Sequence, residues 1–270
     1  MRVVRTIAEV REELLAPRGR GERIGLVPTM GALHAGHESL MHAAREMSDV
    51  VVVSLFVNAA QFTTADDLAR YPRDEEADRG VAEGAGANLL FAPSADELYP
   101  AGFDTWVEPG RLATILEGAA RPGHFRAVAT VCAKLFSIVG PTTAHFGQKD
   151  AQQVAVIRRL VADLDLPVEI VVHPTIRDTD GLALSSRNVF LTPAERTAAL
   201  ALPRSLDAGL AAHQSRSDPV DAARAVLDAE PRLEVDYVAV ADFGEPTLVA
   251  AVRAGTTRLI DNVVLRRSDR

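Results

Sequence analysis

The sequence predicts an α/β fold in two parts, a doubly wound parallel sheet over residues 1–175 and a smaller C-terminal α/β domain over residues 176–270. Two stretches, 24–47 and 142–163, each read as an apolar strand, a short turn and an amphipathic helix. The nearly continuous apolar run at 49–57 is typical of a strand that a parallel sheet buries on both faces. Together these observations favour alternating strands and helices over an all-helical or all-β chain.

The other elements are expected from the same periodicities. Before the hinge we expect a strand at 88–92, a short strand around Trp106, a helix at 126–139 and a last parallel strand at 168–172. The only plausible hinge runs from Pro174 to Gly181. After it we expect helices to about Ala229, followed by strands at 235–241, 248–252 and 257–265.

Composition points to a globular protein that acts on small molecules. With 270 residues, of which 47% are hydrophobic, the chain can bury a sizeable core. The formal charge of -8 and the scattered basic residues predict neither nucleic acid nor a membrane surface as a partner. Cys132 is the only cysteine, so no intrachain disulfide can form, and a reducing compartment is expected. The charged segment 1–15 excludes a signal-peptide core and no apolar run would span a bilayer, so we expect a cytoplasmic protein.

The turn after the first apolar strand is equipped to hold an anion. The strand ends at Pro28, which lacks a ladder donor, and Gly31 and Gly36 let the backbone approach a ligand closely. His34 and His37 lie at the start of the following helix, where unpaired N–H groups and the helix dipole favour phosphate. A metal-binding pair and a helix-capping histidine are the alternatives. Since the chain has neither a Walker loop nor a G-x-G-x-x-G fingerprint, this turn is its best cradle for a nucleotide.

Polar residues follow the second apolar strand. Asn58 and Gln61 come directly after it, at the carboxyl end where ligands of parallel sheets bind, and a plain polar loop is the alternative. The acidic cluster at 74–78 is most simply a solvated helix face, with a metal site as the alternative. Arg121 and His124 precede the helix at 126–139, where a histidine either lines a site or caps the helix.

The second strand-turn-helix stretch carries one of the two lysines of the chain. Of the 29 basic residues only Lys134 and Lys149 are lysines, so ordinary positive surface sites are filled with arginine. Lys149 lies in the turn 147–150, where a flexible ammonium can follow a moving phosphate. Lys134 lies among apolar residues in a helix and can simply extend its ammonium to solvent. Scarcity therefore supports a functional role for Lys149 without deciding it.

A third turn with donors suited to phosphate follows the hinge. We call the three turns, which hold His34 and His37, Lys149, and Ser185 to Arg187, the phosphate-type turns. The turn Leu184-Ser185-Ser186-Arg187 combines two hydroxyl donors with a guanidinium. Such a set can bind a polyphosphate and move with it as it leaves. A plain loop is the alternative for such a tripeptide. Because Gly181 and the hinge lie just upstream, we expect this turn to be mobile without nucleotide and to close over one.

Several of these strings resemble motifs of the pantothenate synthetase family, which belongs to the nucleotidylyltransferase superfamily. His34-Ala35-Gly36-His37 fits the superfamily "HxGH" motif, which binds the triphosphate of ATP, and the lead-in Pro28-Thr29-Met30-Gly31 is more specific to the family. The family motifs "FVNPxQF", "RPxHFxGV" and "GEKDxQQ" are matched with Ala59, Ala127 and Gln148 as departures. Thr256–Asn262 also resembles the family's C-terminal end, so the match covers nearly the whole chain.

The resemblance implies a Rossmann-like nucleotide-binding domain at 1–175 that binds ATP and pantoate, with 176–270 as a lid. It implies catalytic roles for His34, His37, Lys149 and Arg187, with His37 described as a proton donor in the family. The implied ATP contacts are Met30, Gly31, Ala32, Leu33, His34, Ala35, Gly36, His37, Gly147, Gln148, Lys149, Asp150, Ile176, Leu184, Ser185, Ser186 and Arg187. The implied pantoate and β-alanine contacts are Asn58, Gln61 and Gln153, with Arg121 and His124 at the rim.

The reaction that the resemblance implies is the ATP-dependent condensation of pantoate with β-alanine through a pantoyl adenylate. It also implies that Mg²⁺ arrives with ATP, that the protein holds no metal site of its own, and that the chain forms a homodimer. Three other functions remain open at this point. They are an adenylyltransferase acting on a phosphate ester, a nucleotide-sensing module without turnover, and a zinc hydrolase built on His34 and His37.

Overall fold

The computed structural model of the chain describes residues 1–266. It divides into two compact units. The first comprises Met1–Gly147 with Gln152–His173, and the second comprises Gln148–Ala151 with the chain from Pro174 onward. The short segment Gln148–Ala151 therefore belongs with the C-terminal part of the chain, although it lies in the sequence between two elements of the first unit.

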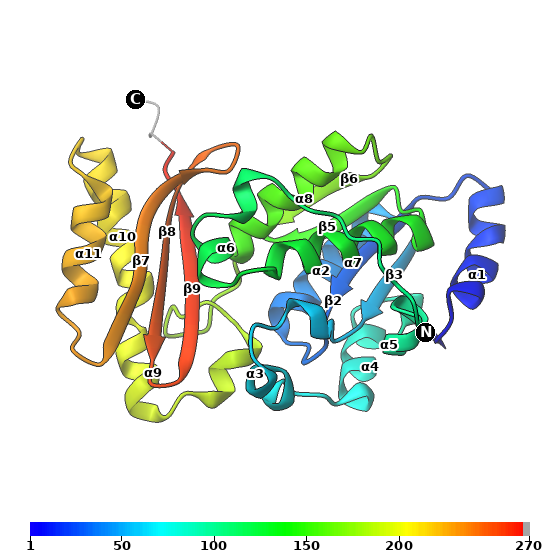
Figure 1. Cartoon of the computed structure of the whole chain (residues 1–270), viewed down its shortest axis with the longest axis horizontal. Coiled ribbons are helices and arrows are strands. Elements are labelled where there is room, and N and C mark those ends of the chain that lie inside the picture. Colours follow the sequence, from blue (N-terminus) through cyan, green and yellow to red (C-terminus); the bar gives the residue numbers. More distant parts are fainter. Residues whose placement is uncertain (267–270) are drawn as a thin grey trace. The chain divides into compact units, whose positions relative to one another are not determined.

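The first unit is built on a six-stranded sheet in the order β1-β4-β3-β2-β5-β6, in which each pair of neighbouring strands is parallel (Figure 1). The strands are β1 (Arg2–Val4), β2 (Ile24–Thr29), β3 (Val50–Leu55), β4 (Leu89–Phe91), β5 (Thr143–Gly147) and β6 (Glu169–His173). The helices are α1 (Ile7–Gly19), α2 (Ala35–Met47), α3 (Ala65–Arg70), α4 (Glu75–Gly84), α5 (Ala95–Leu98), α6 (Glu117–Ala120), α7 (His124–Val139) and α8 (Ala151–Asp163). Its short 3-10 turns are η1 (Ala59–Gln61) and η2 (Arg111–Ala113), whereas the turn η3 (Gln148–Asp150), which follows β5, belongs to the second unit.

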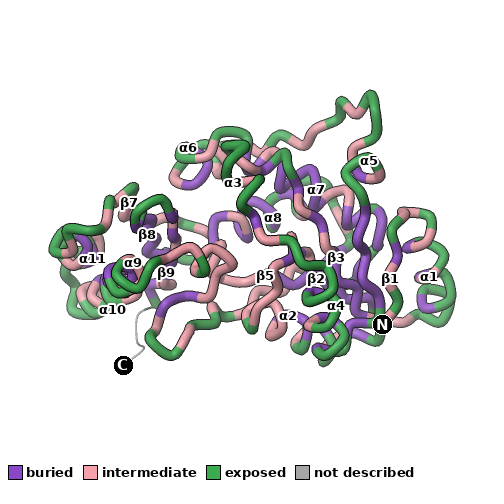
Figure 2. The backbone as a smooth tube through the Cα atoms, turned by 90° about the horizontal axis from the view of Figure 1, so that it is seen from below, coloured by how far each residue is buried: buried purple, intermediate pink, exposed green. Residues whose placement is uncertain are grey.

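Helices cover both faces of this sheet, as the prediction of a doubly wound fold requires. Leu26 and Val52 face a core shared with α1, α7 and α8, whereas Val27 and Val53 face a second core shared with α2 and α4. Side chains alternate between the faces of a strand, so strands buried on both faces must be apolar at successive positions. Figure 2 shows β2 and β3 as buried.

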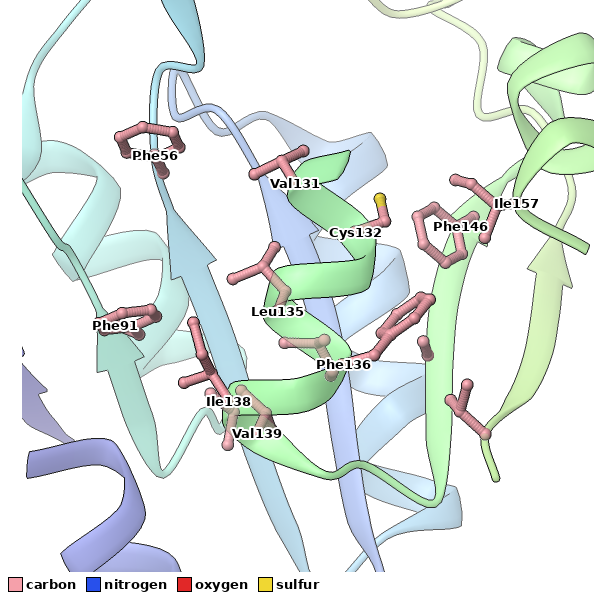
Figure 3. Packing of buried hydrophobic residues seen from close by; sticks show 14 of the residues in the cluster. Phe56, Phe91, Val131, Cys132, Leu135, Phe136, Ile138, Val139, Phe146 and Ile157 are labelled. Atoms are coloured by element: carbon pink, nitrogen blue, oxygen red, sulfur yellow. The ribbon is translucent and has the colours of Figure 1, made fainter. Parts of the chain in front are cut away.

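Helix α7 supplies much of the larger core. Its Leu135 and Phe136 lie over the strands, opposite Phe91 and Phe146 (Figure 3). Each such side chain contributes about 1.5–3 kcal/mol to folding when it is fully buried. This packing holds the first turn of α7 against the carboxyl-end loops of the sheet.

The predicted elements are largely confirmed, with two corrections. Pro28 does not end its strand, because β2 continues to Thr29 in register with β3. Beyond Leu26, β2 has lost its other neighbour β5, so a missing donor is tolerated there. The segment around Trp106 is not a strand; its ring stacks on Tyr99, at 6.0 Å between centroids, and lies under the guanidinium of Arg126.

The second unit pairs helices with an antiparallel sheet in the order β7-β8-β9 (Figure 1). Its elements are η4 (Ser186–Phe190), α9 (Pro193–Ala199), α10 (Ala201–Gln214), α11 (Pro219–Asp228), β7 (Leu233–Asp242), β8 (Pro246–Ala254) and β9 (Thr257–Val264). Leu206 of α10 and Leu227 of α11 pack with Leu248 of β8 in a separate core. Throughout residues 1–266, each helix is too short or too polar to cross a bilayer.

Candidate active site

The two histidines of the first phosphate-type turn form the N-terminal cap of α2. His34 is the cap residue, and its Nδ1 accepts a hydrogen bond from the Gly36 N–H at 3.1 Å. His37 Nδ1 accepts from the His34 N–H at 3.3 Å, and the ring centroids are 4.2 Å apart. Because Nδ1 is the acceptor in each ring, a neutral imidazole carries its proton on Nε2. The capping alternative is therefore correct for His34, and in this tautomer each ring carries its proton on Nε2.

The loop before this cap is held by a carboxylate from α4. Asp78, which is 4% exposed, accepts from the backbone N–H groups of Ala32 at 3.0 Å and Leu33 at 2.7 Å. Gly31 has φ 86°, and a Cβ there would lie 2.7 Å from Asp78 Oδ2, so only glycine fits. The expectation that the acidic cluster at 74–78 is a solvated face is thus wrong for Asp78, although the neighbouring Glu75 and Glu76 are exposed.

Asn58 and Gln61 are buried and connected to the same loop. Asn58 Nδ2 donates to Gln61 Oε1 at 3.2 Å and to the Ala127 carbonyl at 3.3 Å. Gln61 Nε2 donates to Met30 Sδ at 3.0 Å. A polar loop that simply faces solvent would not bury two amides, so that alternative is wrong.

The first turn of α7 completes this group. His124 Nδ1 donates to the Gln61 carbonyl at 3.0 Å, and Arg121 Nη2 donates to the same oxygen at 3.2 Å. With its proton on Nδ1, His124 accepts at Nε2 from Arg121 Nη1, 3.3 Å away. The helix starts at His124 with Gly123 as its cap residue and no side-chain cap, so the capping alternative is wrong here. Met30, Asn58, Gln61, Arg121 and His124 thus form one hydrogen-bonded cluster, which we call the amide cluster.

The two adjacent glutamines at the start of α8 have different surroundings. Gln152 is buried and holds the loop after η2, since it accepts from the Glu117 N–H at 3.0 Å and donates to the carbonyls of Leu112 at 2.6 Å and Ile115 at 2.8 Å. Gln153 lies half-buried one position further along the helix. The contact of Gln153 with pantoate stays a prediction.

In the second unit, β9 lies beside both remaining phosphate-type turns, η3 and η4. Asn262 of β9 donates from Nδ2 to the carbonyls of Gln148 and Lys149, each at 2.9 Å. Ser185 Oγ accepts from the Arg187 N–H at 3.2 Å and so caps η4. Strand β9 thus places the Lys149 turn and the Ser185-Ser186-Arg187 turn next to the same element.

The segment that holds Ile176 is tied to these turns within the second unit. The Leu184 N–H donates to the Ile176 carbonyl at 2.9 Å, and the Ile176 side chain is 36% exposed. Arg177 donates to both carboxylate oxygens of the buried Asp261, at 2.6 and 3.1 Å. Burial would lower the pKa of Arg177, but this ion pair outweighs it and raises the pKa.

The predicted site residues therefore fall into two sets. The first unit carries Met30 to His37, the amide cluster, Gly147 and Gln153, and the second carries Gln148 to Asp150, Ile176 and Leu184 to Arg187. Sequence reasoning missed Asp78, Gln152, Asp261 and Asn262, each a buried polar residue without periodic signal. Within residues 1–266, no three His, Cys, Asp or Glu side chains gather as a metal-binding group.

Fold and site together define a class of protein. Polar side chains and a helix N-terminus gather in the loops after β2 and β3 of a doubly wound sheet, the edge at which such folds bind nucleotides and small polar substrates. The chain is thus an α/β protein of the nucleotide-binding class. It matches the family described as pantoate-beta-alanine ligase over residues 2–264, and it belongs to this family.

Curated relatives agree over the whole length. The chain is 50% identical over 283 residues to the pantothenate synthetase of Moorella thermoacetica, with 100% of both chains covered. It is 53% identical over 279 residues to the pantothenate synthetase of Roseiflexus sp., which covers 98% of this chain and 99% of the relative. The family resemblance inferred from the motifs is confirmed.

Solved structures confirm the fold class. The crystal structure of pantothenate synthetase from Thermus thermophilus has a TM-score of 0.93 at 45% identity and covers 98% of this chain and 99% of its own. That of pantoate-beta-alanine ligase from Francisella tularensis, complexed with beta-gamma ATP and beta-alanine, has a TM-score of 0.83 at 34% identity and covers 98% of both chains.

Proposed function

We propose that this chain condenses pantoate with β-alanine, using ATP, to give pantothenate, AMP and pyrophosphate. The observation that carries the proposal is the amide cluster, in which the neutral amide of Gln61 bonds to both Asn58 and Met30, and Met30 lies in the loop that leads to the histidine-capped start of α2. Family membership supports it, as does the Francisella relative, whose structure holds an ATP compound and β-alanine.

The chemistry has two balanced steps. A pantoate carboxylate oxygen attacks the α-phosphorus of ATP, and pyrophosphate leaves with the electrons of the broken P–O bond. The β-alanine nitrogen then attacks the acyl carbon of the adenylate and AMP leaves, while the amine loses a proton. Neither step needs a covalent bond to the protein, so the residues act by alignment and by neutralising charge.

Residues of the first unit have two roles in this proposal. The Nε2–H groups of His34 and His37 and the N-terminus of α2 donate to ATP phosphate oxygens. The amides of Asn58, Gln61 and Gln153 hold pantoate, whose hydroxyls and carboxylate suit neutral amide donors and acceptors. Arg121 and His124 shape this site by fixing the Gln61 carbonyl.

Residues of the second unit neutralise the phosphates. Lys149 and Arg187 supply positive charge, and Ser185 and Ser186 supply hydroxyl donors as the pyrophosphate leaves. We propose that ATP enters as its magnesium complex, with the metal carried by the phosphate oxygens of the substrate. The lid role of 176–270, the homodimer and the cytoplasmic location remain predictions.

The alternatives make different demands on the site. An adenylyltransferase that acts on a phosphate ester would need basic side chains directed at that phosphate, whereas here Asn58 and Gln61 are neutral and Arg121 and His124 donate to the Gln61 carbonyl. A nucleotide-sensing module would bind ATP without releasing pyrophosphate. A turnover assay therefore separates both alternatives from the proposal.

The test is exchange of labelled pyrophosphate into ATP. Exchange should depend on pantoate and not on β-alanine, because the acid is activated before an amine is needed. Gln61→Ala should abolish most of the pantoate-dependent exchange, while Gln214→Ala, at the C-terminal end of α10, should leave it unchanged. Exchange that requires β-alanine would rule out a free adenylate, and exchange without pantoate would rule out the substrate assignment.

A further inference from the structure

The buried side-chain amide of Asn262 in β9 is hydrogen-bonded to the turn that carries Lys149. Asn262 is 6% exposed, and its Nδ2 donates to the Gln148 and Lys149 carbonyls at 2.9 Å each. Gln148 Nε2 donates back to Asn262 Oδ1 at 3.2 Å. The partners are 113 and 114 residues apart in the sequence, so these bonds are a tertiary feature.

The direction of these bonds makes residue 148 and residue 262 depend on each other. Both N–H groups of Asn262 Nδ2 are committed to carbonyl oxygens, which can only accept. Asn262 Oδ1 must then face a donor, and the Gln148 amide supplies one. A glutamate at position 148 would be acceptor-only when ionised and could not donate to Asn262 Oδ1. Gln148 thus supplies the donor that this orientation of Asn262 requires.

The adjacent residue anchors the strand that bears Asn262. Asp261, 2% exposed, accepts from the Asn262 N–H at 2.8 Å through Oδ1 and holds Arg177 through both oxygens. The Asp261 side chain is fully buried while that of Arg177 is 34% exposed, so loss of Arg177 would leave a buried carboxylate unpaired, which is costly. The residue before Asn262 is thus bonded both to the Asn262 N–H and to Arg177.

We propose that Gln148 and Asn262 form a positioning pair that fixes the backbone of η3 and thereby places the Lys149 ammonium for adenylation. The inference rests on the function proposed above. A lysine carries its ammonium on a flexible four-carbon stem, so the location of its Cα limits the volume that its ammonium reaches. Holding the carbonyls on both sides of the Lys149 Cα restricts that location before the substrate arrives. Such preorganisation speeds the step in which charge develops.

The first arm of the test uses single variants at the pair. Asn262→Ala removes two donors and should lower the adenylation kcat on the order of 10- to 100-fold, the range expected when a catalytic group is misplaced by about 1 Å. Asn262→Asp should be at least as impaired, because a carboxylate would face two carbonyl oxygens. Gln148→Glu tests the pair from the other side, in case the β9 variants do not fold, and should also lower kcat.

The matched control is Asn88, a structural asparagine of the first unit. Its Oδ1 accepts from the Val51 N–H at 2.8 Å and from Arg45 at 3.1 Å, so it too joins distant segments. Asn88→Ala should lower stability and leave kcat and KM nearly unchanged, since Val51 and Arg45 lie outside the predicted site. A kcat loss at Asn88 equal to that at Asn262 would mean that general destabilisation explains both, and the inference would be wrong.

The second arm asks whether Asn262 acts through Lys149. In a double-mutant cycle, Asn262→Ala should cost little further activity once Lys149 is already alanine, because non-additivity marks residues that act as a unit. Equal losses in both backgrounds would overturn the inference.

Amide hydrogen exchange gives a readout that does not depend on activity, since the amides of 148–151 should exchange faster in Asn262→Ala than in the wild type. If the wild-type enzyme shows no pantoate-dependent exchange of pyrophosphate into ATP, the proposed function is wrong. If amide hydrogen exchange at 148–151 is the same in Asn262→Ala as in the wild type, only the positioning pair is refuted.

Discussion

The two lysines of the chain lie in different physical settings. Lys134 is on α7, with its Nζ 4.9 Å from the Phe103 ring centroid and 5.8 Å from that of Tyr99. These cation–π contacts give it a structural reason to be lysine. Lys149 lies in η3, where Asn262 holds its backbone carbonyl. Scarcity of lysine pointed to both residues, and only their surroundings separate them.

Lys149→Ala should lower the adenylation rate on the order of 100-fold or more, as loss of a preorganised charged donor does. Lys134→Ala should leave turnover nearly intact and lower the free energy of unfolding by about 0.5–2 kcal/mol, the range of cation–π contacts. Pyrophosphate exchange and urea unfolding measure the two effects. Equal kinetic losses at both positions would refute the role assigned to Lys149.

The buried His145 forms a hydrogen-bonded pair with the half-buried His173 that the sequence did not suggest. His145 Nδ1 lies 2.9 Å from His173 Nε2, and its own Nε2 lies 3.1 Å from Thr143 Oγ1. Burial, reinforced by the neighbouring imidazole, lowers the pKa of His145 from 6.5 to about 4. Burial also lowers the pKa of His173.

This pair predicts acid sensitivity. The pKa of His145 is lower in the folded than in the unfolded chain, so the unfolded chain binds more protons between about pH 6.5 and about pH 4. Stability should be full above about pH 6.5 and fall as the pH drops toward about 4. Urea midpoints across this window measure it. His145→Gln should flatten the slope, and His42→Gln, at an exposed histidine of α2, should keep it.

At the scale of elements, the site depends on helix starts and short turns. The α2 cap, the first turn of α7 and the 3-10 turns η3 and η4 each present donors at a point where backbone groups need partners. The loop before α2 is fixed from outside by Asp78. The turn η4 is reached through a different kind of feature, a tight turn at Gly181. There φ is 92°, and the Gly181 N–H donates to the Asp178 carbonyl.

We expect the turn at Ser185 to Arg187 to close on the leaving pyrophosphate. Arg187→Ala should then reduce the adenylation rate more than ATP affinity, because the contact strengthens as charge builds on the leaving group. Given preformed pantoyl adenylate, the variant should make pantothenate at close to the normal rate, since pyrophosphate has already left. Arg204→Ala, at an exposed arginine of α10, should change neither half-reaction. An equal loss in both half-reactions for Arg187→Ala would show that the turn holds the adenylate instead.

At the scale of the whole molecule, the two units have separate cores and two kinds of sheet, one parallel and one antiparallel. Continuous apolar strands between helices predicted the parallel sheet of the first unit. Strands that alternate with turns after residue 229 predicted a smaller C-terminal domain of another architecture. The sequence did not reveal that Gln148–Ala151 belongs to the second unit. A turn of four residues has no core of its own, so its membership depends on which distant strand supplies its hydrogen bonds.

Helices, strands and the family motifs could be read directly from the chain, because their periods and spacings are written in consecutive residues. The same holds for Asn58, Gln61, His34 and His37, which lie where an apolar strand stops. Their partners could not be read in this way. Asp78 meets Ala32 across 46 positions and Asn262 meets Gln148 across 114, and a single buried polar residue leaves no periodic pattern in the sequence. Only the folded chain brings such groups within hydrogen-bond distance, because burial requires each of them to find a partner.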